Sequence, residues 1–226
     1  MKWDYSLSAS KLNKFNECPR CFWDLCNRKI EYRGIFPSLP GGLDRVLKAY
    51  TDHCRMTGAM PVEMSGKIPA DATLYGTVEE MKRMRHWKSN PVKPLIATAS
   101  GVVSLILAFD DLITDARGIS PFDWKSKGDK PRDNGAQYYQ TQLDVYVLAG
   151  RRHGWAMSGV GYLGYLWPDG YDASGQMRMG SEVYELACDE ARALDLLERA
   201  TACLAGERPE QSLVCELCKF SEARVA

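Results

Sequence analysis

The run Leu105-Ile106-Leu107-Ala108-Phe109-Asp110-Asp111 is apolar until it ends in two carboxylates, and Asp123-Trp124-Lys125 follows twelve residues later. Between these stretches, Asp115-Ala116-Arg117-Gly118 has the composition of a tight turn. The pattern therefore predicts two antiparallel strands joined by that turn. Because alternate side chains of a strand share a face, Asp123 and Lys125 must point the same way and Trp124 the opposite way.

A carboxylate of the first strand, Asp123 and Lys125 would then meet at one end of the sheet. Two carboxylates suit a hard cation, and Mg²⁺ keeps several waters and needs only one or two such ligands. The cation lowers the pKa of a bound water, which becomes a nucleophile. Lys125 would position or deprotonate that water, or neutralise charge in the transition state. An isolated Asp-x-Lys is common as solvated charge at a strand end, so this prediction depends on its surroundings.

The helix predicted over residues 137–151 carries Tyr138, Gln142 and Tyr146 at intervals of four, which places them on one face. Gln142 could reach over the sheet end, where its amide would hold a phosphate or a metal-bound water. A partly buried aromatic face with a glutamine at its rim is the structural alternative.

This order of motifs resembles the PD-(D/E)XK nuclease superfamily. The resemblance is closest to the RecB-like branch, which includes the CRISPR adaptation exonucleases and the nuclease domains of AddAB-type recombination enzymes. The segments Leu7-Ser8-Ala9-Ser10-Lys11-Leu12 and Cys18-Pro19-Arg20-Cys21 are also typical of that branch. The resemblance covers nearly the whole chain; the ordered combination is fairly specific, whereas no single motif is.

The resemblance implies an α/β fold with a restriction-endonuclease-like core, a mixed central β-sheet flanked by helices, and an N-terminal helical elaboration. It implies Asp110 and Asp123 as ligands of Mg²⁺ or Mn²⁺, Lys125 as the catalytic lysine, and Gln142 and Tyr146 as the helix motif. Strand alternation allows only one of Asp110 and Asp111 to face the site, and the resemblance favours Asp110. The expected function is a metal-dependent deoxyribonuclease that hydrolyses DNA phosphodiester bonds in repair, recombination or defence.

Two positions depart from the family pattern. The family carries a histidine or an acidic residue on an early helix, and none of the three histidines clearly occupies that position, although Asp44 or Asp52 could substitute. The usual glycine three residues before the first aspartate is Leu107. The absent early-helix ligand, together with the incomplete set of late cysteines described below, motivates the alternative function, a catalytically inactive DNA-binding or interaction module that retains the nuclease fold. A third reading is a metal-clasped structural domain inside a larger helicase or recombination complex.

The eight cysteines include two Cys-x-x-Cys pairs, Cys18 with Cys21 and Cys215 with Cys218. Four thiolates can hold zinc or a 4Fe-4S cluster. Iron–sulfur members of the branch use one early and three late cysteines, whereas here Arg224 stands roughly where a third late cysteine would come. Cys18 and Cys21 could equally be small buried hydrophobic residues. The other four cysteines are expected to be packed.

The chain has 226 residues, and its 29 basic residues balance 29 acidic ones. Any nucleic-acid-binding surface must therefore be local. Basic runs such as Lys82–Lys88 and Lys125–Arg132 are usually solvated, but the second adjoins the proposed site and could hold DNA phosphates. We expect DNA, as single strands or duplex ends, and a helicase, recombination or defence complex as partners.

The protein is expected to be cytoplasmic and not to bind membranes. Its first residues lack a signal-peptide core, and the near-apolar run over 95–109 is shorter than the roughly 20 residues that cross a bilayer. We expect one domain over residues 1–226, with a nuclease core over about 90–190 and terminal segments that pack together.

Hydrophobic periodicity and turn residues predict the remaining elements. Ser8 is the expected N-cap of a first helix whose buried face carries Leu12, Phe15, Cys18 and Phe22. The other predictions, in chain order, are a loop over 33–42, helices over 43–56 and 78–87, two strands within 95–109, strands over 160–167 and 181–187, and a helix over 189–204.

Overall fold

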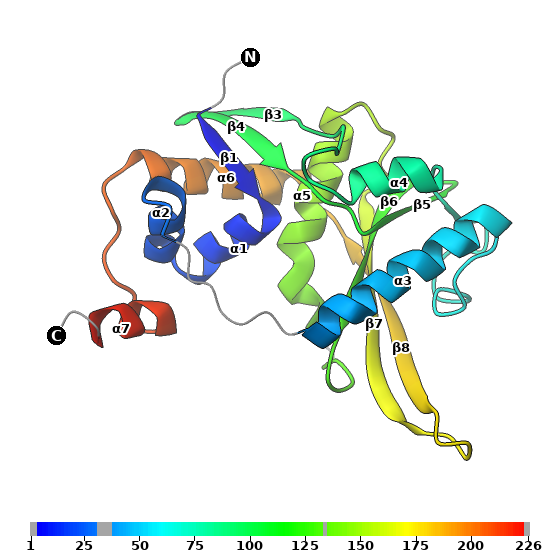
Figure 1. Ribbon diagram of the computed structural model, residues 1–226. Coiled ribbons are helices and arrows are strands. Elements are labelled where there is room, and N and C mark those ends of the chain that lie inside the picture. Colours follow the sequence, from blue (N-terminus) through cyan, green and yellow to red (C-terminus); the bar gives the residue numbers. More distant parts are fainter. Residues whose placement is uncertain (1–3, 31–37, 133–134, 224–226) are drawn as a thin grey trace. The chain divides into compact units, whose positions relative to one another are not determined.

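The computed structural model describes residues 4–30, 38–132 and 135–223 (Figure 1). The chain forms two compact units, and each unit combines segments that are far apart in the sequence. Unit 1 contains Met1–Phe36, Lys93–Ile106 and Ala191–Ala226, and unit 2 contains Pro37–Val92 and Leu107–Glu190. The structure has the predicted α/β class, with mixed sheets, flanking helices and a helical N-terminal segment.

Unit 2 is built on a five-stranded sheet with the order β2-β5-β6-β7-β8. Strands β6 and β7 are parallel, and every other neighbouring pair is antiparallel. The strands are β2 (Thr73–Leu74), β5 (Asp111–Asp115), β6 (Gly118–Ser126), β7 (Val160–Tyr171) and β8 (Met177–Ala187). The helical elements are α3 (Ser38–Thr57), α4 (Val78–Met84), the 3₁₀ turn η1 (Gly135–Tyr139) and α5 (Gln140–Arg152).

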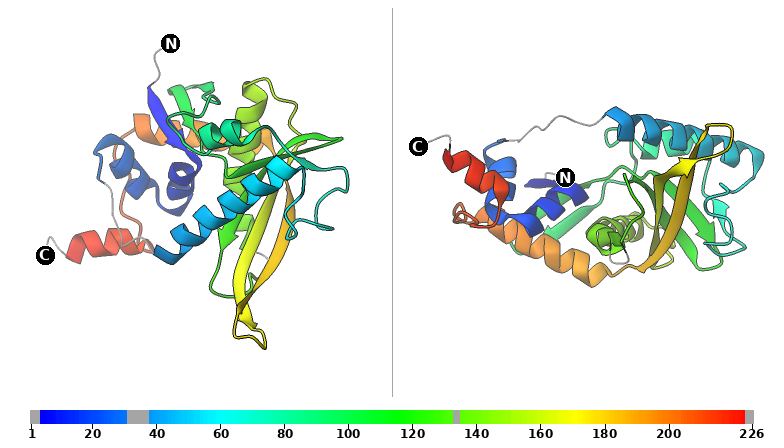
Figure 2. Two further views of the ribbon diagram at one scale, coloured as in Figure 1. Left: turned by 45° about the vertical axis from the view of Figure 1, so that its right-hand side comes forward. Right: turned by 90° about the horizontal axis from the view of Figure 1, so that it is seen from below.

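Helices α3 and α5 cover opposite faces of this sheet (Figure 2). On one face, Leu47 of α3 packs in a cluster with Phe122 and Trp124 of β6. On the other face, Leu143 of α5 packs in a cluster with Tyr165 of β7. Because side chains alternate along a strand, Asp123 lies on the α5 face, between its two aromatic neighbours in the sequence.

The turn between β5 and β6 is the predicted one, because Asp115 pairs with Gly118. Gly118 has a φ of +124°, and a Cβ there would lie 2.3 Å from the carbonyl oxygen of Ala156. Only glycine fits this position without a shift of the backbone. The turn fixes the register of the hairpin, in which Asp111 pairs with Phe122 at the far end.

The segment before β5 is not the predicted strand. Strand β4 ends at Ile106, so the strand expected over 105–109 is wrong beyond that residue. From Leu107 to Asp110 the backbone has partners outside any ladder. The carbonyls of Leu107, Ala108 and Asp110 accept hydrogen bonds from the side chains of Asn90, Tyr146 and Arg85, respectively. The amide of Phe109 donates to the carbonyl of Met84.

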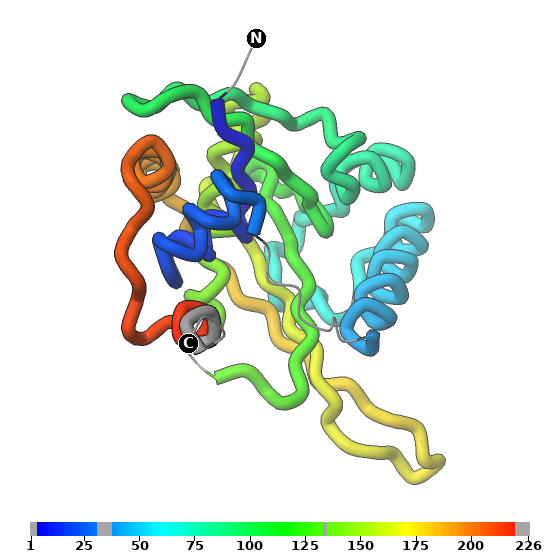
Figure 3. Tube along the Cα trace, turned by 60° about the vertical axis from the view of Figure 1, so that its left-hand side comes forward, coloured from blue at the N-terminus to red at the C-terminus, as the bar shows by residue number. Residues whose placement is uncertain are grey.

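Unit 1 contains a three-stranded sheet with the order β1-β4-β3, and Figure 3 traces β1 along β4. Its strands are β1 (Tyr5–Ser8), β3 (Leu95–Thr98) and β4 (Gly101–Ile106). Its helices are α1 (Ala9–Glu17), α2 (Pro19–Asn27), α6 (Glu190–Ala205) and α7 (Glu216–Ala223). The prediction found β3 and β4 as two strands joined by a turn, and it missed the short parallel strand β1.

The first helix is broken where the sequence predicted it to continue. Ser8 is the N-cap of α1 as expected, and its side chain accepts a hydrogen bond from the amide of Lys11. Cys18, however, has an extended backbone and separates α1 from α2. The reason is Pro19, since the residue before a proline is pushed out of the helical region. Cys18 thereby becomes the N-cap of α2.

Other boundaries also differ from the predictions: α5 begins at Gln140, so Tyr138 lies in the 3₁₀ turn before the helix and not on its face, and α4 ends at Met84 instead of residue 87. Residues 38–42 were expected in a loop, but α3 begins at Ser38, and Pro40 is tolerated because it lies in the first helical turn. The rest of that predicted loop, residues 33–37, lies outside the described residues. The hairpin of β7 and β8 extends to Tyr171 and Met177, beyond the predicted strands, and its tip projects from the sheet of unit 2 (Figure 3).

Candidate functional site

Asp110 and Asp123 come together at the end of the β5–β6 hairpin. Asp111 pairs with Phe122, and one further step of the same antiparallel register places Asp110 opposite Asp123. Burial raises the pKa of Asp123 to about 7, the carboxylate of Asp110 contributes to the rise, and Lys125 opposes it. The two adjacent carboxylates, one of them 1% exposed, supply oxygen atoms of the kind that bind a hard cation.

Gln142 of α5 connects this corner to the helix. Its Nε2 donates to Oδ1 of Asp123 over 2.6 Å and to the hydroxyl of Tyr146 over 3.0 Å. Its Oε1 accepts from Nζ of Lys125 over 3.3 Å. The ammonium of Lys125 also contacts Asp123. With a carboxylate on one side and an ammonium on the other, only one orientation of the amide satisfies both partners.

Tyr146 anchors the other end of these contacts. Its hydroxyl donates to the carbonyl oxygen of Ala108 over 2.6 Å, and its ring packs on Phe109 with centroids 4.7 Å apart. The side chain is 6% exposed, and burial raises its pKa well above the usual range. The hydroxyl is therefore neutral and can donate while it accepts from Gln142. Thus the structure brings all five predicted residues, Asp110, Asp123, Lys125, Gln142 and Tyr146, into one connected group.

Asp111 has a different environment from Asp110, in agreement with strand alternation. It is 1% exposed and lies between the guanidinium groups of Arg55 and Arg85. Both arginines also bind Asp52 of α3, at 3.0 and 2.7 Å. Burial raises the pKa of Asp111, and the two arginines oppose that rise. Asp52, one of the suggested early-helix ligands, therefore belongs to a buried ion-pair cluster next to the site.

Lys48 of α3 is a member of the site that the sequence analysis did not identify. Its Nζ lies 2.9 Å from Oδ1 of Asp110 and 2.8 Å from a carboxylate oxygen of Asp44. Burial alone would lower the pKa of Lys48, but the two carboxylates together raise it. The spacing Asp44-x-x-x-Lys48 indicated an ion pair within the helix, but no sequence signal connected that pair to Asp110.

Among the described residues, no third His, Cys, Asp or Glu side chain lies close enough to Asp110 and Asp123 to complete a three-residue metal site. His53, His86 and His153 are all exposed. Asp44 approaches the corner only through Lys48. Among the suggested substitutes on α3, Asp44 is therefore separated from Asp110 by the ammonium of Lys48.

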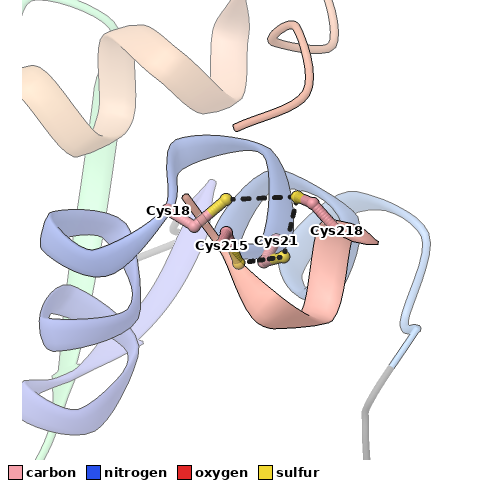
Figure 4. Close-up of side chains that lie close together, drawn as sticks. All are labelled: Cys18, Cys21, Cys215 and Cys218. Carbon is pink, nitrogen blue, oxygen red and sulfur yellow. Dashed lines mark hydrogen bonds between the residues drawn. The ribbon is translucent and has the colours of Figure 1, made fainter. Parts of the chain in front are cut away.

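The four cysteines of the two Cys-x-x-Cys pairs form a cluster in unit 1 (Figure 4). The sulfur of Cys18 lies 3.5 Å from that of Cys218, and the sulfur of Cys21 lies 3.7 Å from Cys215 and 3.6 Å from Cys218. All four sulfurs lie within 4.8 Å of one another. They can together hold a metal, as zinc or in an iron–sulfur cluster.

Each pair brackets the first turn of a short helix, so the backbone N–H groups of that turn face the sulfurs. Burial opposes ionisation of Cys215, but hydrogen bonds from the backbone of Cys218 and from the thiols of Cys21 and Cys18 lower its pKa to about 7. Burial raises the pKa of Cys18 and of Cys21. One thiol thus ionises readily near neutral pH, which favours the approach of a cation.

The remaining cysteines, Cys26, Cys54, Cys188 and Cys203, are also free thiols and are buried or partly buried. Arg224, at the position of a third late cysteine, lies outside the described residues. Among the residues that the structure describes, no helix combines the length and apolar character that crossing a bilayer requires.

Comparisons with known proteins add little to this geometry. No family model matches the sequence, and no curated protein matches it. Among solved structures, the chain is similar to one described as the crystal structure of SSO0001. The two are 15% identical, with a TM-score of 0.49, and the match covers 98% of this chain and 87% of that chain. At this identity and TM-score, the similarity assigns neither a family nor a function.

Proposed function

We propose that the protein is a Mg²⁺- or Mn²⁺-dependent deoxyribonuclease of the RecB-like PD-(D/E)XK class. The observation that carries the proposal is the connected group of Asp110, Asp123, Lys125 and Gln142 at the end of one hairpin. These residue types occur in the order typical of the class, and residues as far apart in the chain as Asp110 and Gln142 meet at one corner. Solvated charges at a strand end would not require such burial or such contacts.

The donor set fits a hard cation. Asp110 and Asp123 supply carboxylate oxygens, and an ion that retains several waters needs no more than two protein ligands. When bound there, the ion would polarise a phosphate oxygen and lower the pKa of a coordinated water. The absence of a sulfur or imidazole ligand among the residues described at this corner disfavours zinc here.

The surrounding residues would orient the reacting groups. Gln142 holds Asp123 on one side and Lys125 on the other, so the lysine cannot turn away from the corner. Its ammonium could donate to a non-bridging phosphate oxygen as negative charge develops there. Tyr146 in turn fixes Gln142 through a neutral hydroxyl.

Cleavage assays of the full chain test this proposal. Linear, circular and single-stranded DNA are incubated with Mg²⁺ or Mn²⁺ and with wild type, Asp123→Asn or Lys125→Met. We expect wild type to cleave and each variant to be slower by about 10²-fold or more. Asp169→Asn and Lys82→Met, which remove exposed charges elsewhere in unit 2, serve as controls. Equal residual cleavage by wild type and both site variants would overturn the proposal.

A second candidate is a DNA-binding or interaction module without catalysis. It is favoured by one observation, the ammonium of Lys48 on Asp110 where the class places a further metal ligand. This candidate requires that the protein bind DNA and leave it intact with every divalent metal. The same assays, accompanied by a gel-shift measurement, separate the two candidates.

We propose that the four-cysteine cluster holds a single zinc ion. Tetrahedral zinc with Zn–S bonds of about 2.3 Å places its sulfurs about 3.8 Å apart, close to three of the sulfur–sulfur distances here, which are 3.5–3.7 Å, and all four sulfurs lie within 4.8 Å of one another. In a 4Fe-4S cluster each thiolate binds a different iron, which separates the sulfurs more widely. Elemental analysis after anaerobic purification tests this: zinc supports it, whereas iron with a visible absorbance band identifies the cluster instead.

The cellular setting follows from the proposed chemistry. A DNA-cleaving domain of this class would act in the cytoplasm in repair, recombination or defence, and a helicase or recombination complex is the expected partner. Co-purification of the tagged chain from its native cells, with and without nuclease treatment, would distinguish a protein partner from proteins that share only DNA.

A further inference from the structure

We propose that an aromatic and basic surface beside Lys125, formed by Tyr138, Tyr139 and Lys127, binds single-stranded DNA and directs it to the Asp110–Asp123 corner. This inference deepens the proposed function, because the destination of the strand is the proposed cleavage site. Binding itself can be measured without cleavage, so the two proposals can fail separately.

The surface alternates rings and cations. Nζ of Lys125 lies 4.5 Å from the ring centroid of Tyr139, and Nζ of Lys127 lies 5.8 Å from the same centroid. The ring of Tyr138 packs edge-on against Tyr139, with centroids 5.0 Å apart. Tyr138 is 60% exposed, so much of its ring is accessible to solvent although one edge is supported. Tyr138 therefore presents a ring beside the lysines that pack on its neighbour Tyr139.

The backbone explains why these side chains gather. Strand alternation places Asp123, Lys125 and Lys127 on the same side, and the amide of Lys127 donates to the carbonyl of Leu166 over 2.9 Å, which continues the pairing with β7. The two tyrosines occupy η1, immediately before α5. Tyr165 of β7 holds this turn to the sheet, because its hydroxyl donates to the carbonyl of Gly135 over 3.1 Å. The rings are therefore positioned before any ligand arrives.

This combination suits a single strand better than a duplex. An exposed ring offers a stacking face to an unpaired base, and lysines beside it can contact the flanking phosphates. In a duplex the bases are already stacked on each other, so Tyr138 would gain little. Sequence would matter little, because every base has a face that can stack.

Charges around the surface indicate the path of the strand. Beyond Lys127, exposed Lys130 and Arg132 add positive charge, opposed in the described part of this loop by Asp129 alone. On the other side, Glu182 of β8 pairs with Tyr165 across the strands and carries a carboxylate that would repel phosphates. The favoured path therefore follows the loop after β6 and passes Tyr138 toward Lys125.

Fluorescence anisotropy tests the inference in the full chain carrying Asp123→Asn, without added divalent metal. The probe is a labelled oligothymidylate of about 20 nucleotides, compared with a duplex and with oligouridylate of equal length. We expect Tyr138→Ala to weaken binding of the DNA strand by about 5- to 100-fold, the range for loss of one stacked base. Tyr138→Phe keeps the ring and should bind within about twofold of the parent.

Two further variants sharpen the test. Tyr171→Ala removes another exposed ring, 68% exposed on β7, and should leave binding unchanged. Lys127→Gln should reduce the slope of log affinity against log salt by about one. The inference is overturned if Tyr138→Ala binds like its parent, if Tyr171→Ala is equally impaired, or if duplex DNA or the RNA strand binds as tightly as the DNA strand. Single-strand binding without any cleavage by wild type would overturn the nuclease proposal alone.

Discussion

The ammonium of Lys48 lies 2.9 Å from a carboxylate oxygen of Asp110, at the corner where a metal ion is proposed to bind. It also lies 2.8 Å from Asp44 of its own helix. A lysine so placed neutralises Asp110 while no metal is bound, and it competes with any cation that approaches. The affinity of the corner for metal therefore depends on a residue that is itself not a ligand.

Replacing Lys48 with glutamine should raise the affinity for Mn²⁺ by about tenfold or more, because a nearby positive charge is removed from a partly buried site. Electron paramagnetic resonance of free Mn²⁺ measures this directly, without any cleavage assay. Lys82→Gln, which removes an exposed lysine paired with Glu79, is the matched control. An unchanged or lower Mn²⁺ affinity in Lys48→Gln would contradict the competition.

Arg85 should be essential for the stability of unit 2. It donates to the carbonyl of Asp110 at 2.8 Å, to Asp52 at 2.7 Å and to Asp111 at 3.1 Å. Removing one partner from a buried charge cluster usually costs about 3–5 kcal/mol. We expect Arg85→Gln to lower the free energy of unfolding by about that amount in urea titrations, and the exposed neighbour Arg83→Gln by less than about 0.5 kcal/mol. Equal effects of the two substitutions would show that the cluster contributes little.

The raised pKa of Asp123 predicts a pH dependence of stability in the metal-free protein. In the folded state this pKa is about 7, and in the unfolded chain it is about 4. Between these values the folded protein binds a proton that the unfolded chain has lost, so the free energy of unfolding falls as pH rises from about 4 to 7. Asp123→Asn should flatten that fall, whereas Asp169→Asn should retain it. Parallel curves for wild type and Asp123→Asn would refute the assignment.

Tyr146→Phe should destabilise the protein and disturb Gln142. The substitution removes a buried hydroxyl that donates to Ala108 and accepts from Gln142, and it leaves these two partly buried partners without that bond. Such losses cost about 1–3 kcal/mol. Urea titration should show that decrease for Tyr146→Phe and no decrease for Tyr171→Phe, whose hydroxyl lies on an exposed residue. Identical midpoints would mean that this hydroxyl is not needed to order the corner.

Cys215→Ser and Cys21→Ser should each abolish stoichiometric metal binding by the cysteine cluster, because every ligand of a closed four-sulfur site is required. Elemental analysis measures the loss, and limited proteolysis should show faster cleavage between α6 and α7. Cys188→Ser, which changes a cysteine outside the cluster, should retain the metal. Full metal content in either cluster variant would rule out four-cysteine coordination.

The local pattern around the hairpin was sufficient to predict much of the site. The turn at Gly118 and the period of two along β6 determine which side Asp123 and Lys125 face, and the period of the helix does the same for Gln142 and Tyr146. These are short-range regularities, so a sequence read without homologues reveals them. Alternation also predicted that Asp110 and Asp111 face different surroundings, as they do, whereas the choice of Asp110 for the site came from the resemblance to the nuclease family.

The partners of the site could not be predicted in the same way. Lys48, Arg55 and Arg85 come from helices distant in the sequence, and their approach to Asp110 and Asp111 depends on tertiary packing. The break at Cys18 was predictable, because Pro19 excludes a continuous helix. The helical spacing of the apolar residues alone, however, predicted one continuous helix. Strand β1 is only four residues long, and it forms through parallel pairing with β4, nearly a hundred residues later.

Cys18 and Cys218 are 200 residues apart, yet their sulfurs lie 3.5 Å from each other. During synthesis, Cys18 and Cys21 leave the ribosome long before Cys215 and Cys218 exist. The cluster cannot be completed until translation has passed residue 218, and a product that stops earlier has only half of the ligands. Metal loading would then report that a chain has been made at least as far as Cys218, so products that stop before that residue could be distinguished by their inability to retain the ion.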